Sequence, residues 1–110
     1  MIFTRPSETR VVRIYDNCEV DNGVVNVSRD AGDTVRWISV SRSEFSIDFD
    51  SSPFEKKHFD VSVQEEQPQP CADSGPLKDA DHAPYATYHY KIQNKTNPEY
   101  KSDPGVDVRK

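Results

Sequence analysis

Three histidines and two cysteines are the side chains in this sequence best suited to bind a transition metal, and the cysteines are its strongest nucleophiles. A zinc site needs three or four converging ligands, and some of them usually lie only a few residues apart. His58, His82 and His89 have no such short spacing between them. We therefore predict that they are exposed strand and loop residues. A metal site that joins these histidines to Cys71 is the weaker alternative.

The two cysteines leave two states open. Cys18 and Cys71 are far apart and form no Cys-x-x-Cys motif, so they are either two free thiols or one disulfide formed in an oxidising compartment. Catalysis by a cysteine needs a neighbour that lowers the pKa of its thiol, and no motif supplies one. There is also no Gly-x-Ser-x-Gly motif and no glycine-rich phosphate loop. We predict a protein that is not an enzyme and has no cofactor.

Charge and hydropathy argue against two classes of partner. The formal net charge is −5, with 14 basic residues scattered among 19 acidic ones, whereas non-specific nucleic-acid binding requires a positive field. No apolar run approaches the roughly 20 residues that span a membrane. We expect neither nucleic acid nor membrane as a partner. Residues 1–10 lack the apolar core of a signal peptide. The predicted location is therefore cytoplasmic if Met1 is the native start, and exported if a signal peptide was removed.

The elements that must position these side chains are predicted from the stretch 32–37. Gly32 and Asp33 favour a turn, after which Val35 and Trp37 alternate with polar residues, as in a strand with one buried face. Trp37 is the only tryptophan of the chain. We place it at the centre of a sandwich core.

The same analysis along the chain predicts short strands separated by turn residues. They lie at 10–15, 24–28, 34–40, 45–49, 59–63, 85–93 and 106–108. Asn22-Gly23 is a turn signal of the hairpin type before the second strand. The segment 64–84 is rich in proline and acidic residues, and we predict a long loop there.

This pattern predicts an all-β fold, an antiparallel Greek-key β-sandwich of about seven strands. A single domain occupies 10–110 and follows a loose lead-in at 1–9. Its predicted core consists of Val35, Trp37, Phe45, Ile47, Phe49, Phe59, Val61, Tyr88, Tyr90 and Ile92. Phe54 is expected to close the sheet from below as a plug.

Several segments are similar to parts of the cupredoxins. Gly32-Asp33-Thr34-Val35-Arg36-Trp37 resembles the cupredoxin strand before the first copper ligand. Tyr88-His89-Tyr90-Lys91-Ile92 resembles the Tyr-x-Tyr-x-Cys strand, and Asp103-Pro104-Gly105-Val106-Asp107-Val108 resembles the last strand. Together with 45–49 and Ser52-Pro53-Phe54, they resemble a group of copperless, cupredoxin-like bacterial proteins of unknown function. The resemblance covers most of 10–109 and implies a cupredoxin-like topology.

The resemblance also implies where copper ligands would stand. A type 1 copper site needs two histidines, a cysteine and usually a methionine. The first histidine would fall near Phe45 or Ser46, the cysteine at Ile92 and the second histidine near Lys95, and no methionine follows. None of these residues is a suitable ligand. We predict that a type 1 copper site is absent.

The function predicted from the sequence is a non-catalytic binding or interaction module. Its contact surface would be the 64–84 loop with its neighbours, because recognition often lies in loops on a rigid scaffold. Tyr85 and Tyr100 flank loops and are expected at one end of the sandwich as a recognition surface. The partner would be an unknown protein or small ligand. Two alternatives stay open: a metal-binding or thiol redox protein that uses Cys18, Cys71 and histidines, and a homo-oligomer that pairs through an edge strand.

Overall fold

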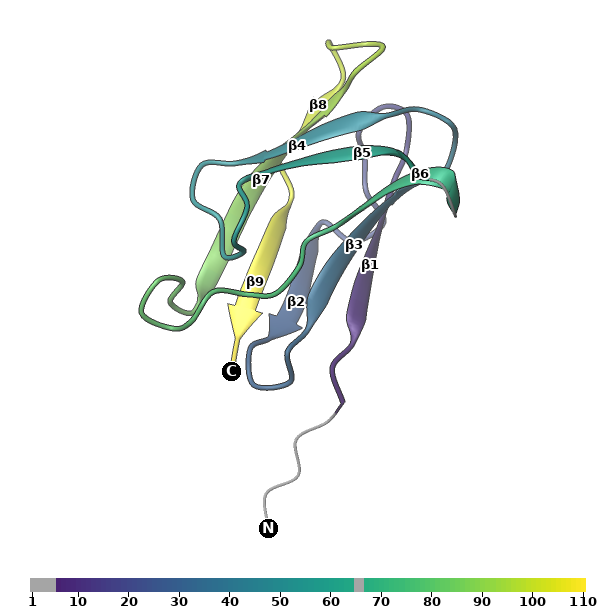
Figure 1. Ribbon diagram of the computed structural model, residues 1–110. Helices are drawn as coiled ribbons and strands as arrows, with labels where there is room; N and C mark the ends of the chain where they lie inside the picture. Colours follow the sequence, from purple (N-terminus) through teal and green to yellow (C-terminus); the bar gives the residue numbers. More distant parts are fainter. Residues whose placement is uncertain (1–5, 65–66) are drawn as a thin grey trace.

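The computed structural model describes residues 6–64 and 67–110, and this part of the chain is built from strands (Figure 1). They are β1 (Thr9–Ile14), β2 (Val24–Ser28), β3 (Thr34–Ser39), β4 (Phe45–Phe49), β5 (His58–Gln64), β6 (Gln67–Asp73), β7 (Ala86–Asn94), β8 (Lys101–Ser102) and β9 (Gly105–Arg109). The described residues include no helix long and apolar enough to cross a membrane. The predicted all-β class is confirmed.

One continuous path of hydrogen-bonded strands folds over on itself into a sandwich (Figure 1). The order is β1-β3-β6-β5-β4-β7-β9-β2, and β8 pairs with β7 beside this path. Six of the eight pairings are antiparallel, but β1 runs parallel to β3 and β2 runs parallel to β9. The prediction of an antiparallel sandwich therefore holds for most of the sheet and is wrong for these two pairs.

The hairpin expected at Asn22-Gly23 does not form. β1 and β2 do not pair with each other. Each pairs in parallel with a strand later in the chain instead, β1 with β3 and β2 with β9. The polypeptide between β1 and β2 turns at Cys18, which has a φ of 70°. An isolated bridge from Ile14 to Val20 then closes this connection.

The prediction of a long loop at 64–84 is also wrong for the first half of that segment. β6 lies there and is hydrogen-bonded to β3 on one side and to β5 on the other. Residues 65–66 of the predicted loop lie outside the described residues. Of the others, 74–84 are irregular, and Arg29 holds this segment by donating hydrogen bonds to the carbonyl oxygens of Lys78 and Ala83. The surface proposed from the sequence is therefore partly a strand of the sheet.

The core is a cluster of aromatic rings around Trp37, which is fully buried. The Trp37 ring centroid lies 5.1 Å from that of Phe59, 5.6 Å from that of Tyr90 and 6.4 Å from that of Phe54. These separations are typical of favourable aromatic pairs. Nine of the ten predicted core residues are buried, Tyr88 is half-buried against the core, and Phe54 is the buried plug that was expected.

A buried carboxylate anchors the turn before β3. Gly32 has a φ of 77°, which favours glycine, and the next residue, Asp33, is fully buried. One oxygen of Asp33 accepts the N–H of Glu8 at 3.0 Å, and the other accepts the N–H of Ser28 at 2.9 Å. The Nε of Arg10 lies 3.7 Å away. This side chain therefore joins the segment before β1, the end of β2 and the start of β3.

Candidate functional site

The structure separates the three histidines that a metal site would need. His58 begins β5, His89 is on the outer face of β7, and His82 lies in the 74–84 segment, where its Nδ1 is 2.6 Å from Asp79 Oδ1. All three are exposed. Within residues 6–64 and 67–110, no group of three or more histidine, cysteine, aspartate or glutamate side chains is arranged to hold a metal ion. Their exposure agrees with the strand and loop positions predicted for them.

Both cysteines are buried, neither forms a disulfide, and they lie on different sides of the sheet. Cys18 belongs to the hydrophobic core, and its Sγ donates to the carbonyl oxygen of Tyr100 at 3.2 Å. Cys71 is opposite Ile38 in β3, on the face away from Trp37 and Ala72. Burial raises the pKa of the Cys18 thiol. The arrangement provides neither a Cys18–Cys71 disulfide nor an activated thiol pair.

The tyrosines proposed as a recognition surface do not share one end of the sandwich. Tyr85 is 53% exposed and Tyr100 is 42% exposed, as expected. Tyr85 precedes the first residue of β7, however, whereas Tyr100 accepts a hydrogen bond from the N–H of Asn94 at the other end of that strand. A strand of this length spans about 30 Å. The prediction that Tyr85 and Tyr100 form one common surface is therefore wrong.

The positions that the resemblance assigned to copper ligands are filled by packing and hydrogen bonds. Phe45 and Ile92 are fully buried in the core. The ammonium of Lys95 forms an ion pair with Asp60 at 2.9 Å. Beside Lys95, the buried Asn94 accepts hydrogen bonds from two backbone N–H groups of the following turn and donates one to the carbonyl oxygen of Asp16. This end of the sandwich is held together by an amide side chain.

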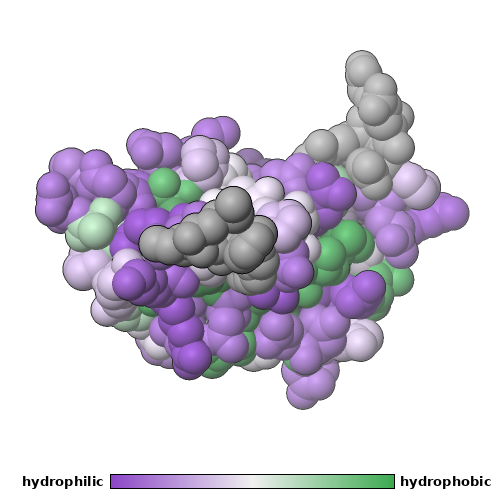
Figure 2. All heavy atoms as spheres, turned by 90° about the horizontal axis from the view of Figure 1, so that it is seen from below, coloured by the Kyte–Doolittle hydropathy of each residue, from purple (hydrophilic) through white to green (hydrophobic). Residues whose placement is uncertain are grey.

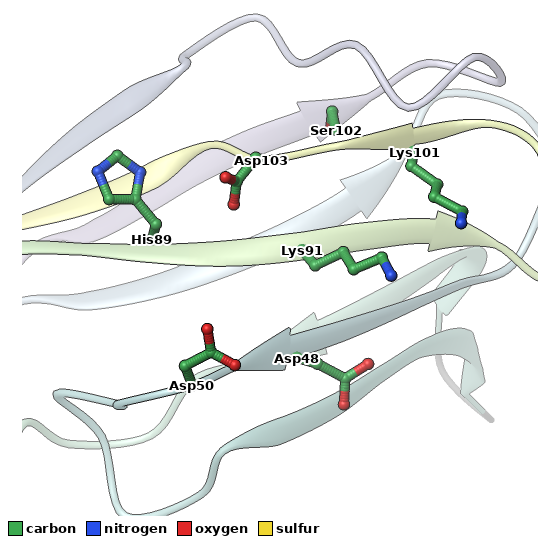
Figure 3. Close-up of a pocket in the computed structure, with 7 residues that line it drawn as sticks. All are labelled: Asp48, Asp50, His89, Lys91, Lys101, Ser102 and Asp103. Atoms are coloured by element: carbon green, nitrogen blue, oxygen red, sulfur yellow. The ribbon is translucent and has the colours of Figure 1, made fainter.

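A groove with a volume of about 560 Å³ lies on the outer face of β4, β7 and β8 (Figure 3). We call it the polar groove, and it is lined by Asp48, Asp50, His89, Lys91, Lys101, Ser102 and Asp103. Its volume is within the range of small-ligand sites, but its lining is charged instead of apolar. It therefore suits a charged ligand that stays partly in water.

Alternation along the strands explains why these charges gather. Asp48 follows the buried Ile47 in β4, and Lys91 lies between the buried Tyr90 and Ile92 in β7, so both side chains must point outward. The strands place Asp48 directly opposite Lys91. Lys101 pairs with Gln93, which brings the second lysine beside β7 as well.

The charges of the polar groove are not neutralised by one another. Among the described residues, Lys91 and Lys101 form no ion pair, and the carboxylates of Asp50 and Asp103 have no cationic partner. Asp48 faces Lys91 across the strands, but it binds His58 on β5, with 2.6 Å between Asp48 Oδ1 and His58 Nδ1. The carboxylate directly opposite Lys91 is therefore engaged by His58 and does not pair with the lysine.

The pKa of His58 is raised, chiefly because Asp48 hydrogen-bonds to the ring, with a further contribution from Asp60, 3.2 Å from Nε2. Lys95, and then His58, lower the pKa of Asp60. Because the pKa of His58 is higher in the folded state, its favourable contribution to stability is complete below about pH 6.5. It is lost as the pH rises through the folded pKa.

Replacing Asp48 by asparagine is expected to lower the pKa of His58, because the neutral amide stabilises the imidazolium less. The pKa is measured by following the ring proton signals of His58 by NMR during a pH titration. His89, which forms no ion pair among the described residues, is the internal control. An unchanged His58 titration in the Asp48→Asn variant would mean that this contact does not persist in solution.

Sequence reasoning did not identify the polar groove, although a signal for it was present. The period of two that places Ile47, Tyr90 and Ile92 in the core points their neighbours Asp48, His89 and Lys91 outward. What alternation does not provide is the register, and the register decides which outward residues of different strands become neighbours.

Comparison with known proteins agrees with this fold. No protein-family model and no curated protein matches the sequence. Among solved structures, a reduced Cu(I) form of an amicyanin mutant at pH 4 is similar, with a TM-score of 0.54 and 17% identity. The Cu(I) form of a second amicyanin mutant has a TM-score of 0.55, again with 17% identity. Both matches cover 92% of this chain and 82% of the amicyanin chain. Amicyanin is a cupredoxin, so the cupredoxin-like fold expected from the sequence is confirmed. Identity at this level shows the fold alone.

Proposed function

We propose that this chain is a non-catalytic binding module on a cupredoxin-like scaffold, and that it binds a charged protein partner through the polar groove. The observation that carries the proposal is the set of unneutralised charges of both signs, two lysines and two aspartates, that the sheet holds side by side. Exposed charges gain little from pairing within one chain. They steer and select partners instead, through charge complementarity.

The rest of the described surface supports recognition by charge more than by apolar contact. The face shown in Figure 2 is mainly hydrophilic, and its hydrophobic areas are small and separate. Three of the exposed large hydrophobic residues lie in or next to strands that do not pair with one another: Val63 in β5, Tyr15 after β1 and Tyr85 before β7. A contiguous apolar patch would instead favour a hydrophobic interface.

This proposal keeps the binding module predicted from the sequence and changes its contact surface. Part of the 64–84 segment is β6, and the remainder is tied down by Arg29. In the polar groove, by contrast, Lys91, Lys101, Asp50 and Asp103 form no ion pair among the described residues.

A binding experiment tests the proposal. We would titrate the ¹⁵N-labelled protein with a set of unstructured peptides that carry lysine and glutamate in every order, and follow the backbone amide signals by NMR. Charged peptides are expected to shift the amides of Asp50, Lys91 and Asp103. The double variant Lys91→Ala/Lys101→Ala should bind these peptides at least about tenfold more weakly, because two charge pairs are lost.

The matched control is the double variant Lys56→Ala/Lys57→Ala, which removes two exposed lysines from the β4–β5 connection, outside the polar groove. It should bind like the unaltered protein. If no charged peptide shifts the groove amides, or if both double variants weaken binding equally, the polar groove is not a binding site.

A further inference from the structure

Building on the proposed function, we propose that the ligand of the polar groove is an extended peptide segment of a partner protein. In that segment, one basic and one acidic side chain lie two positions apart and face the groove together. The inference depends on three properties of the groove: its polarity, the repeat of the strands beneath it, and its open form.

The polar groove has a negative end and a positive end. In Figure 3, Lys91 and Lys101 extend toward the same end, whereas the carboxylates of Asp50 and Asp103 lie toward His89 at the other. Asp48 lies near the lysines but is engaged by His58. A ligand that matches both ends must therefore carry an acidic group near the lysines and a basic group near Asp50 and Asp103.

The strand repeat sets the distance between these two groups. His89 and Lys91 are two residues apart on β7, and Asp50, which directly follows the neighbouring β4, is two residues from Asp48. Two residues of a strand correspond to about 6.6–6.8 Å. An extended peptide laid along β7 has the same repeat, so its side chains at positions i and i+2 point to the same face and reach the two ends of the groove together.

The open form of the groove favours a peptide over a free amino acid. The α-amino and α-carboxylate groups of a free amino acid are joined through a single carbon atom, so glycine and alanine, which carry no other charge, cannot reach both ends of the groove at once. All but one of the lining side chains are exposed, and Ser102 is half-buried, so the site resembles a furrow along the sheet. A furrow of this kind accommodates a continuing chain on both sides.

The proposal is tested with blocked peptides of one composition in a Gly/Ser background. They carry one lysine and one glutamate at spacings i,i+1, i,i+2 or i,i+3, in both orders, and their affinities are measured by NMR titration or calorimetry. We expect one i,i+2 order to bind about two- to fivefold more tightly than the other spacings, since only it makes both charge contacts at once. Free glycine and free alanine should not bind measurably.

A charge-swapped variant provides the matched control. Asp50→Lys/Asp103→Lys/Lys91→Glu/Lys101→Glu reverses the two ends while all four positions remain on the surface, and circular dichroism would verify its fold. It is expected to prefer the opposite order of lysine and glutamate at the same i,i+2 spacing. That reversal cannot arise from a general loss of stability.

The outcomes separate this inference from the proposed function. Equal binding of all spacings, with shifts at the groove amides, would refute the i,i+2 ligand and leave the binding module in place. Equal binding of the free amino acids would likewise refute a peptide ligand. If no peptide of any spacing shifts the groove amides, both proposals fail.

Discussion

Replacement of Trp37 by alanine is expected to lower the free energy of unfolding by about 3–5 kcal/mol. The ring is fully buried and contacts four other aromatic rings, those of Phe49, Phe54, Phe59 and Tyr90. Its removal leaves a cavity where strands β3, β4, β5 and β7 converge, and surrounding rings cannot fill it without leaving their own partners. Because the replacement also removes the only tryptophan, unfolding by urea should be followed by far-ultraviolet circular dichroism.

The control for this substitution is Val63→Ala. Val63 is in β5 but is 64% exposed, so truncating it should change the free energy of unfolding by less than about 0.5 kcal/mol. If Trp37→Ala proved as mild as this control, the aromatic cluster would not be the centre of the core.

Replacement of Asp33 by alanine should be comparably damaging, at about 3–5 kcal/mol, although only a few atoms are removed. The partly buried N–H groups of Glu8 and Ser28 would lose their acceptor, and Arg10 would lose a nearby anion. Because Asp33 joins three segments, the loss should loosen β1, β2 and the start of β3 together. Thermal unfolding and amide hydrogen exchange at residues 7–12 and 25–36 would measure this.

Two comparisons identify the cause of an Asp33 effect. Asp33→Asn keeps one carbonyl acceptor and should lose less stability than Asp33→Ala. Asp30→Ala, in the exposed part of the same turn, should be nearly neutral. Should Asp30→Ala destabilise as much as Asp33→Ala, the effect would belong to the turn in general and not to the buried carboxylate.

The buried side of the sandwich was predictable because alternation along a strand requires no knowledge of its neighbours. Trp37, Phe45 and Tyr90 could be assigned to the core from their own segments alone. β6 could not, since Pro68 and Pro70 argue against a strand inside a sheet. The structure accommodates them where β6 extends beyond its pairing with β3, which begins at Cys71, and where its register with β5 is irregular.

The candidate site was less predictable than the core because it depends on pairing between strands. The sequence shows that Asp48 and Lys91 point outward, but their meeting across β4 and β7 follows from a register that no local pattern determines. The misplacement of Tyr85 and Tyr100 has the same origin. Both flank loops, and only the length of β7 shows that those loops lie at opposite ends of the sandwich.

The parallel pairing of β2 with β9 has a consequence for how the chain folds during synthesis. β2 is made early, but β9, its hydrogen-bonding partner among the described strands, leaves the ribosome only after all the other described strands. Until then Val25 and Val27, which end in the core, belong to a strand whose backbone has no partner. Sheets that depend on such distant contacts form slowly. An unpaired apolar strand also promotes aggregation of nascent chains. We therefore expect β2 to be prone to aggregation until β9 emerges.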